Sequence, residues 1–330
     1  MPRKNLAAAD NANLDRAARE FPHPGSAPSD PRTPSAPNVD IAGRLRLFAE
    51  AFDSQLRRLL APVGDAPASL VEAVNYTALA PGKRIRPYLV VRSCELCGGS
   101  RDRAWAPGAA IECIHAFSLI HDDLPAMDDD DMRRGRPTCH KKFGEAIAIL
   151  SGDALAILPF ELLGRHVPDS GRAARMMLEL ASSAGWTGMI GGQAVDVQGQ
   201  SLPPSVELAG YIHERKTASL FAAACRIGAI AAGAADAMVE RFGRFGRHLG
   251  RAFQIADDVL DIEGSSASLG KPVGKDADAN KQSLPRCVGV AESRRLAVQE
   301  IRLATAELGE FGSAADDLRA LSDFVVVRNY

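Results

Sequence analysis

Apolar residues recur at the spacing of an amphipathic helix along most of the chain from residue 41 onward. In the first stretch Leu45, Phe48, Phe52, Leu56 and Leu59 follow this spacing, which places them on one face of a helix. No stretch alternates convincingly between apolar and polar residues with the period of two that a strand requires. Helices are expected over residues 41–60, 70–79, 109–121, 146–163, 172–185, 208–224, 291–308 and 314–327. The pattern predicts one all-α domain of roughly ten or more helices.

Residues 1–38 differ from the rest of the chain. They are rich in Ala, Pro, Ser and charge and have no apolar periodicity, which predicts a disordered extension before a domain at residues 39–330. The first thirty residues have no apolar core of a signal peptide. The most apolar run, residues 220–239, is interrupted by Arg226 and Asp236 and predicts a buried helix. We therefore expect a cytoplasmic protein that is not integral to a membrane.

The overall charge and the cysteines exclude two further classes. The net charge of −2 provides no basic field that would attract nucleic acid. The six cysteines contain a single C-x-x-C pair, Cys94 and Cys97, without a second pair at zinc spacing. Buried, reduced thiols are expected rather than a metal centre.

The stretch DDLPAMDDDD, residues 122–131, has Asp at six of its ten positions and follows an apolar run. On a helix, each close pair of like charges is unfavourable by roughly 0.2–0.5 kcal/mol. Carboxylates at the end of a buried helix are hard oxygen ligands suited to Mg²⁺. Arg133, Arg134 and Arg136 follow at once and suit a phosphate that the metal could share. The alternative is a solvated acidic turn with basic neighbours.

A cationic motif, GKRIRP, occupies residues 82–87. It brings Lys83, Arg84 and Arg86 together where Pro87 indicates the start of a helix. Backbone N–H groups at a helix start and three cations suit a diphosphate. A charged, solvated turn would explain the motif equally well.

A second acidic cluster, FQIADDVLD, occupies residues 253–261. Asp257 and Asp261 are four residues apart, and Gln254 lies three before Asp257, so all three share one helix face. Because the neighbouring positions are apolar, burying an uncompensated pair of carboxylates would be costly. A bound cation would resolve this conflict, and so would exposure of the acidic face at the surface.

Together the two acidic clusters predict a polar patch at the mouth of an apolar cavity, if they face each other across a helical bundle. Such a cavity suits a substrate with a hydrocarbon tail and an anionic head. His115 is singled out because it lies within roughly two turns of the first acid, although a lone His is usually structural. Lys216, beside Thr217 in an apolar setting, more often extends its ammonium to solvent than acts in catalysis.

From about residue 41 to residue 330 the chain resembles the short-chain trans-prenyl diphosphate synthases, and among these the bacterial farnesyl diphosphate synthases most closely. Six motifs occur in the family's order: GKRIRP, SLIHDDLPAMDDDDMRRGRPTCH, GDAL, GGQ, KT and FQIADDVLD. The resemblance implies an all-α isoprenoid-synthase bundle around a central apolar cavity, usually a homodimer, with more than one Mg²⁺ in each active site. It implies head-to-tail condensation of isopentenyl diphosphate onto dimethylallyl or geranyl diphosphate, with release of pyrophosphate.

The resemblance also implies roles for individual residues. Asp122, Asp128 and Asp257 would be the main Mg²⁺ ligands, supported by Asp123 and Asp261. The expected contacts of isopentenyl diphosphate are Lys83, Arg86, His115 and Arg134. The expected contacts of the allylic diphosphate are Arg133, Lys216, Thr217, Gln254 and Lys271. Of all these, Lys216, Asp122 and Asp257 are expected to act most directly in catalysis.

The sequence departs from the family's pattern in two places. Pro81 replaces the Gly usually found before Gly82. Asn280, Gln282 and Ser283 stand where Gly, Ser and Thr are common before the Pro that is here Pro285. We expect that the loop preceding Pro285 still closes.

Product length is predicted from Phe117, five residues before Asp122. In the family, bulk at this level acts as a floor for the growing chain, and an aromatic residue resembles enzymes that stop at fifteen carbons. The alternative is that Phe117 is an ordinary core residue, and a geranylgeranyl product then remains open.

Rival classes explain fewer of the motifs. A terpene cyclase or a head-to-head, squalene-type synthase would share the helices and the acids but not GKRIRP. A non-catalytic subunit would usually lose acidic positions, and both clusters here are complete. A calcium-binding EF-hand loop fails because the sixth position from Asp128 is Arg133, where that loop needs Gly.

Overall fold

The computed structural model describes residues 39–62, 64–263 and 281–327, so the predicted extension at residues 1–38 and Lys271 lie outside the described residues. The first half contains α2 (Ile41–Leu59), α3 (Ala68–Ala78), α4 (Ile85–Leu96), η1 (Arg101–Ala104), α5 (Trp105–Asp122), α6 (Cys139–Phe143) and α7 (Glu145–His166). The second half contains α8 (Ser170–Ala184), α9 (Met189–Gly199), α10 (Val206–Ile212), η2 (His213–Ala218), α11 (Ser219–Ala232), α12 (Asp236–Glu263), α15 (Leu284–Val288), α16 (Val290–Glu307), η3 (Gly309–Ala315) and α17 (Asp316–Val327).

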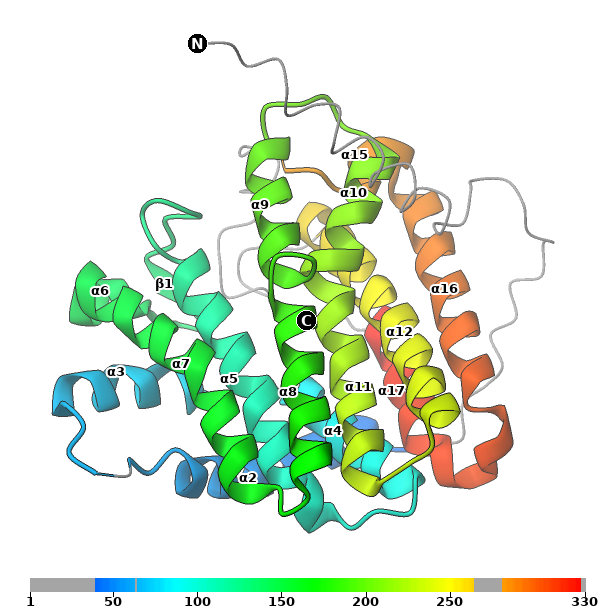
Figure 1. Ribbon diagram of the computed structural model, residues 1–330. Helices are drawn as coiled ribbons and strands as arrows, with labels where there is room; N and C mark the ends of the chain where they lie inside the picture. Colours follow the sequence, from blue (N-terminus) through cyan, green and yellow to red (C-terminus); the bar gives the residue numbers. More distant parts are fainter. Residues whose placement is uncertain (1–38, 63, 264–280, 328–330) are drawn as a thin grey trace.

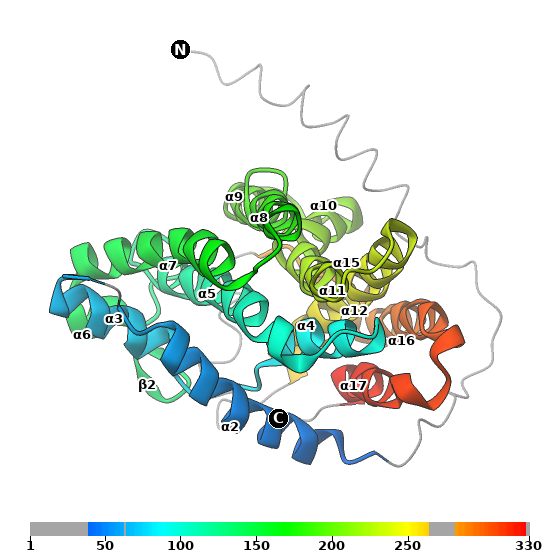
Figure 2. The same ribbon diagram turned by 60° about the horizontal axis from the view of Figure 1, so that its bottom comes forward.

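The long helices form a bundle, which confirms the predicted all-α fold (Figure 1). α5 packs along α7, while α11 packs against α4, α8 and α12, and α12 packs against α16. Figure 2 shows α2 and α4 crossing one end of the bundle, with α16 and α17 beside each other. The amphipathic face predicted for the first helix is buried, with Phe52 and Leu56 fully enclosed.

Two glycines allow the close packing that positions the second acidic cluster. A Cβ atom at Gly246 would lie 2.5 Å from the carbonyl oxygen of Phe221, and one at Gly250 would lie 2.6 Å from the Cα atom of Ala218. Glycine is therefore required at both positions for α12 to approach α11 and η2 this closely. The approach places Gln254, one turn further along α12, against Thr217.

Some helix boundaries differ from the predicted ones. The helix expected over residues 208–224 is divided into α10, the π-helical η2 and α11. The buried helix expected over residues 220–239 was wrong as a single element, because Gly233 adopts φ +84° and ends α11 in the left-handed conformation that glycine favours. The described residues also include two very short strands, β1 (Met132–Arg133) and β2 (Arg136–Pro137), which pair antiparallel.

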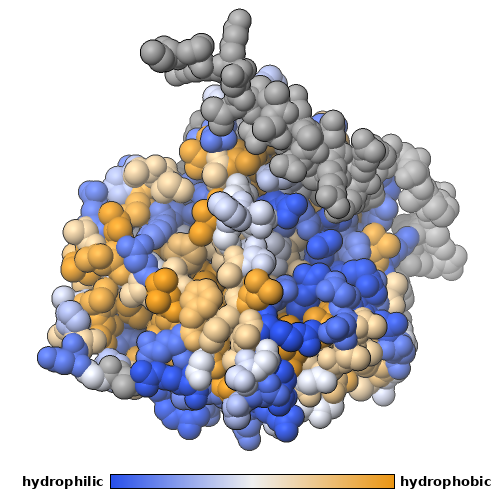
Figure 3. Space-filling model, viewed as in Figure 1, coloured by the Kyte–Doolittle hydropathy of each residue, from blue (hydrophilic) through white to orange (hydrophobic). Residues whose placement is uncertain are grey.

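Among the described residues, α7 has the length and composition to cross a membrane. In the fold it packs along α5 and against α3, α6 and α8. Its outer face exposes Ile149, Leu150 and Ile157. Figure 3 shows apolar surface on the side of the molecule where α7 lies.

Candidate active site

A cavity of about 1030 Å³ lies between α5, α9, η2 and α12. Asp122 and Asp128 line it from the first acidic stretch, and Asp257 and Asp261 line it from α12. Apolar side chains, among them Phe117, Leu119, Met189, Ile190, Phe253 and Leu260, line it as well. The two acidic clusters therefore share one cavity with apolar walls, as the sequence predicts.

The first acidic stretch turns back on itself where α5 ends at Asp122. The Asp128 amide donates to the carbonyl oxygen of Asp122 at 2.9 Å, which brings the two residues together. Asp122, Asp128 and Asp130 line the cavity. Burial raises the pKa of the Asp122 carboxyl, and the nearby ammonium of Lys216 opposes this shift.

Asp123, only 3% exposed, contacts Arg133 and is not part of the cavity lining. The Nε atom of Arg133 donates to both carboxylate oxygens of Asp123, at 2.8 and 3.0 Å. Burial raises the pKa of Asp123, and the hydrogen bond from Arg133 acts against it. The pairing directs Arg133, which does line the cavity, so Asp123 contributes to the site through this arginine.

A compact group of possible metal ligands lies in the same stretch. Asp129, Asp131 and His140 each place one ligand atom within 4.8 Å of the others. Asp122, Asp128 and Asp257 do not form such a group within the part of the chain that the structure describes. Mg²⁺ is usually held by one or two carboxylates together with waters and substrate phosphates, so separated carboxylates around a cavity still fit it.

The motif GKRIRP contributes only part of its positive charge to the cavity. Arg84 adopts φ +49° and is buried, where its Nε atom donates to Asp53 at 2.8 Å and its Nη1 atom to Glu112 at 2.5 Å. The expectation of three cations for one diphosphate was therefore wrong for Arg84, because two carboxylates hold it inside the fold. Arg86 lines the cavity with its guanidinium 4.7 Å from the ring centroid of Phe221.

Lys83 and Arg134 flank this motif differently. The Nζ atom of Lys83 lies 5.5 Å from the ring centroid of Phe324 on α17, and Lys83 is not part of the cavity lining. Arg134 lines the cavity, and its Nη1 atom donates to the carbonyl oxygen of Pro81 at 2.8 Å. A Cβ atom at Gly82 would lie 2.7 Å from Nη1, so glycine leaves the space that Arg134 occupies.

His115 lines the cavity beside these arginines. Burial lowers the pKa of its imidazole well below the usual value, and the positive charges of Arg86, Arg134 and Arg133 lower it further. The imidazole is therefore neutral near pH 7. A neutral ring can donate one hydrogen bond and accept another, which suits a polar contact with an anion or its bound water.

Lys216 and Thr217 reach the cavity from the π-helical segment η2. The Nζ atom of Lys216 donates to Asp196 on α9 at 2.7 Å. Although burial acts to lower the pKa of Lys216, the carboxylates of Asp196 and Asp122 raise it above its usual value. The ammonium is therefore permanently charged and lies near the first acidic stretch. Single π-helical turns are frequent at functional sites.

A chain of hydrogen bonds connects Thr217 to the second acidic cluster. The hydroxyl of Thr217 donates to Oε1 of Gln254 at 2.6 Å, and Nε2 of Gln254 donates to Asp258 at 3.0 Å. Asp258 also lies 2.9 Å from Nε2 of His213 and accepts from the amide of Leu284 at 3.3 Å. This chain fixes the orientation of Thr217 and Gln254 toward the cavity.

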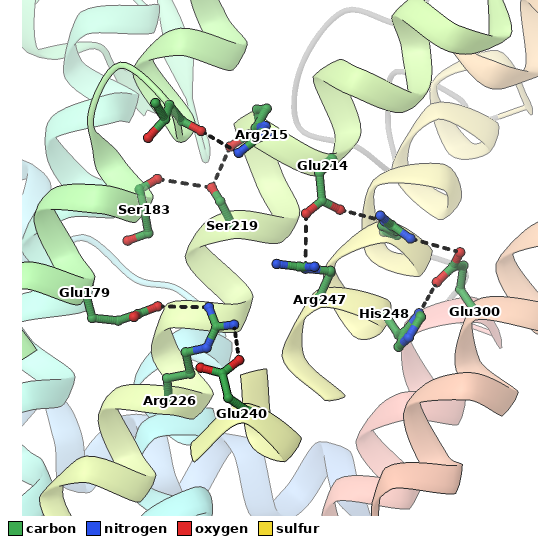
Figure 4. A network of polar contacts seen from close by, with 12 residues as sticks. Glu179, Ser183, Glu214, Arg215, Ser219, Arg226, Glu240, Arg247, His248 and Glu300 are labelled. Carbon is green, nitrogen blue, oxygen red and sulfur yellow. Dashed lines mark hydrogen bonds and ion pairs between the residues drawn. The ribbon is translucent and has the colours of Figure 1, made fainter. Parts of the chain in front are cut away.

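Buried charges support η2 from behind (Figure 4). Arg247 and Arg251 of α12 pair with Glu214 at 3.1 and 2.6 Å. Glu300 of α16 lies 2.6 Å from Nδ1 of His248. Figure 4 shows these pairs bridging η2, α12 and α16. Because breaking a buried ion pair such as Arg251–Glu214 is strongly destabilising, this pair holds the segment that carries Lys216 in one position.

The sequence pattern does not assign several residues of the site. Lys281 lies 3.4 Å from Asp128, and Asp196, Asp258 and His213 bind the predicted residues described above. Gln282 is almost fully buried beside Lys281. The adjacent motif residues could have indicated Asp258, but the contact of Lys281 depends on how distant helices pack.

The fold and the cavity define a class of enzyme. An all-α bundle holds a cavity whose lining combines apolar side chains, carboxylates and several cations, which suits a substrate with an apolar chain and a diphosphate head. The model of the family described as polyprenyl synthetase matches residues 67–313. The chain belongs to this family, and its members' chemistry makes it a trans-prenyltransferase that acts on isoprenyl diphosphates.

Individual relatives support the family assignment. The farnesyl diphosphate synthase of Escherichia coli is 41% identical over 299 residues, which cover 88% of this chain and all of the relative. A chloroplastic geranylgeranyl pyrophosphate synthase 11 of Arabidopsis thaliana is 43% identical over 272 residues, covering 80% of this chain and 76% of the relative.

Solved structures agree with the fold. An apo FPP/GFPP synthase from Zymomonas mobilis has a TM-score of 0.77 at 36% identity, covering 88% of this chain and 99% of that one. A geranyltransferase from Helicobacter pylori, complexed with magnesium and isoprenyl diphosphate, has a TM-score of 0.77 at 29% identity, covering 88% and 98%. These comparisons confirm the isoprenoid-synthase fold predicted from the motifs.

Proposed function

We propose that the protein is a farnesyl diphosphate synthase, which adds isopentenyl diphosphate to dimethylallyl and then geranyl diphosphate and stops at fifteen carbons. The observation that carries this proposal is the position of Phe117. Its ring is buried, lines the cavity and meets the His121 ring edge-on, with centroids 5.3 Å apart. Phe117 precedes Asp122 by five residues on α5, so it stands between one and two turns along the helix from the acids. A longer product would have to displace this ring.

The polar end of the cavity supports a division between two diphosphates. Arg86, His115 and Arg134 gather at one part of the lining, and we assign them, with Lys83, to isopentenyl diphosphate. Arg133, Lys216, Thr217 and Gln254 are assigned to the allylic diphosphate, together with Lys271 outside the described residues. Fixed cations stabilise the leaving pyrophosphate most effectively because they need not reorganise as its charge develops.

Asp122, Asp128 and Asp257 are proposed as the Mg²⁺ ligands, with Asp123 and Asp261 in support. The carboxylate oxygens of the four that line the cavity fit a hard divalent ion that also binds diphosphate oxygens, and Asp123 gives its support through Arg133. When bound, the metal would neutralise charge on the leaving group. Within this arrangement, Lys216 contributes a fixed positive charge near Asp122, and the Asp123–Arg133 pair orients a second guanidinium.

The condensation also requires positioning and protection from water. The allylic C–O bond breaks to give a carbocation, and the double bond of isopentenyl diphosphate must lie close to it. Apolar walls formed by Phe117, Leu119 and Phe253 keep water away from the cation. We assign the final proton abstraction to the departing pyrophosphate, since the neutral His115 is assigned to isopentenyl diphosphate.

We further propose that the enzyme is a cytoplasmic homodimer. Exposed apolar side chains favour association: Ile157 on α7, Leu178 on α8 and Trp186, which is 88% exposed, after α8. Monomers seldom leave large contiguous apolar patches in water. The six free cysteines agree with a reducing compartment. Light scattering of the purified protein in solution would test the dimer.

A geranylgeranyl diphosphate synthase is the second candidate. It is favoured by the chloroplastic relatives of that name, which are 41–43% identical to this chain, close to the 41% of the farnesyl diphosphate synthase. The two candidates share every assignment above except the role of Phe117.

A product assay tests both candidates. Purified protein would receive isopentenyl diphosphate and Mg²⁺ with dimethylallyl, geranyl or farnesyl diphosphate in separate reactions. Farnesyl diphosphate as the end product would support the proposal. A twenty-carbon product would retain the mechanism and reject the assigned length. The absence of condensation by folded protein with any acceptor would instead favour a non-catalytic subunit.

A further inference from the structure

Gln282 lies in the short segment that connects residue 281 to α15 and is only 4% exposed. Its Nε2 atom donates to the carbonyl oxygens of Gly199 at 2.9 Å and Leu202 at 3.1 Å, with Pro203 at 3.4 Å. Its Oε1 atom accepts from the amide of Ser205 at 3.1 Å. One carboxamide thus binds the connection between α9 and α10 through both of its polar atoms.

The backbone around Gly199 leaves space for the side chain of Gln282. A Cβ atom at Gly199 would lie 3.2 Å from Cγ of Gln282, so a larger residue there would press on it. A serine or threonine at this position would have only one hydroxyl on a shorter side chain. A serine side chain cannot reproduce contacts with four backbone groups spread over Gly199, Leu202, Pro203 and Ser205.

The segment held by Gln282 carries a cation to the cavity. Lys281 lines the cavity, and its Nζ atom lies 3.4 Å from both carboxylate oxygens of Asp128. On the other side of Gln282, the amide of Leu284 donates to Asp258 at 3.3 Å, and Asp258 orients Gln254. Residues 281–284 are therefore fastened at both ends to groups assigned to the allylic diphosphate and its metal.

We propose that Gln282 is a positioning residue, whose buried carboxamide fixes Lys281 beside Asp128 by tying residues 281–284 to the α9–α10 connection. The inference rests on the proposed function, because it assumes that Lys281 is one of the cations that face the allylic diphosphate. Without the hydrogen bonds of Gln282, residues 281–284 are no longer held against the α9–α10 connection, and Lys281 no longer has a single position. A misplacement of about 1 Å can lower an enzymatic rate on the order of 10²-fold.

The test compares Gln282→Met, which keeps the length and apolar volume but removes the hydrogen bonds, with the wild-type protein. Gln200→Met is the matched control, because it makes the same change in the same connection at a partly exposed residue. Lys281→Ala and the double variant Gln282→Met/Lys281→Ala complete a double-mutant cycle. For each protein, kcat and KM are measured with the allylic diphosphate and isopentenyl diphosphate varied in turn, and Tm is recorded.

We expect Gln282→Met to lower kcat/KM for the allylic diphosphate by about 10- to 100-fold, with a smaller change in KM for isopentenyl diphosphate. Lys281→Ala should give a similar loss, and the double variant should lose little more than either single variant. Gln200→Met should behave as wild type. Equal losses for both substrates, losses that multiply in the double variant, or unchanged kinetics in Gln282→Met would overturn the inference.

A binding measurement separates this inference from the proposed function. Calorimetry with inorganic pyrophosphate and Mg²⁺ requires no turnover, and Gln282→Met should weaken binding by about tenfold, which is a difference of roughly 1.4 kcal/mol. If the wild-type protein forms no prenyl product, the proposed function fails, while the binding comparison still tests the position of Lys281. Equal affinity of the two proteins for pyrophosphate would refute the positioning role of Gln282.

Discussion

Replacing Phe117 with alanine should change the main product from fifteen to twenty carbons. The substitution removes a ring of six carbons from the cavity wall, and one more isoprene unit adds five. Burying five additional carbons is worth roughly 4 kcal/mol at about 0.8 kcal/mol per carbon, which corresponds to nearly a thousandfold preference. Under the proposed function, the ring in the wild-type protein denies this space to the growing chain, so the gain becomes available only in the variant.

The same change should lower stability. Phe→Ala in a core costs about 3–5 kcal/mol, and Phe117 contacts a cavity on one side, so a loss near the lower end is expected. The free energy of unfolding of a typical domain is about 5–15 kcal/mol, and the variant should therefore fold. The assay incubates each protein with isopentenyl and geranyl diphosphates and separates the dephosphorylated products by chromatography.

Two control variants make the result specific. Phe117→Tyr keeps the bulk of the ring and should still stop at fifteen carbons. Phe253→Ala removes a different aromatic ring from the cavity wall, one that packs 5.1 Å from the ring centroid of Phe221, and should not lengthen the product. If folded Phe117→Ala keeps the wild-type product distribution, or if Phe253→Ala lengthens the chain equally, the floor lies elsewhere.

Three further outcomes follow from the charges of the structure. Arg84→Met should lower the free energy of unfolding by about 3–5 kcal/mol because it leaves Glu112 buried without its partner, whereas the exposed Arg46→Met should change it by less than about 0.5 kcal/mol; denaturant titration measures both. The folded-state pKa of His115 is depressed, so its contribution to stability is present above the unfolded value of about 6.5 and is lost as pH falls below it. When the pH falls from about 7.5 to 5.5, the free energy of unfolding should therefore decrease by up to roughly 1.4 kcal/mol less in His115→Gln than in the wild-type protein. Equal decreases in the two proteins would contradict the burial of a neutral ring. Chelation of divalent ions should abolish condensation without loss of helical circular dichroism, and added Mg²⁺ should restore it; unfolding on chelation would show a structural metal instead.

The parts of the site that lie within one helix could be predicted from the sequence. Asp257, Asp261 and Gln254 share a face because their spacing is close to one helical turn, and all three line the cavity. The placement of Asp122 at the end of a buried helix followed from the apolar run before it. In both cases the direction of a side chain depends only on local helical geometry.

The parts that depend on backbone reversals or distant packing could not be predicted. Arg84 was grouped with Lys83 and Arg86, but its positive φ turns it toward Asp53 and Glu112, which are far from it in the sequence. The π-helical turn at η2 has no distinct apolar period. The sequence shows Gln282 only as a departure from the family's pattern, since its four backbone partners belong to a connection about 80 positions away.

Each acidic cluster contains two adjacent aspartates, Asp122 with Asp123 and Asp257 with Asp258. The members of each pair have different partners, which reduces the cost of placing like charges side by side. Successive residues on a helix point about 100° apart, so neighbouring carboxylates cannot contact the same ligand equally. Asp122 lines the cavity, whereas Asp123 is neutralised by Arg133. Asp257 and Asp258 both line the cavity, but the oxygens of Asp258 also accept from Gln254 and Leu284 and meet His213.

The second aspartate of each pair therefore acts on residues that line the cavity. Asp123 holds a guanidinium at the cavity, and Asp258 holds an amide and the start of α15. Removing either carboxylate would release a buried donor as well as a charge, and an unsatisfied buried group costs about 1–3 kcal/mol. An Asp-rich stretch thus combines cavity-facing oxygens with the supports that orient neighbouring cations, because one turn of helix presents both directions.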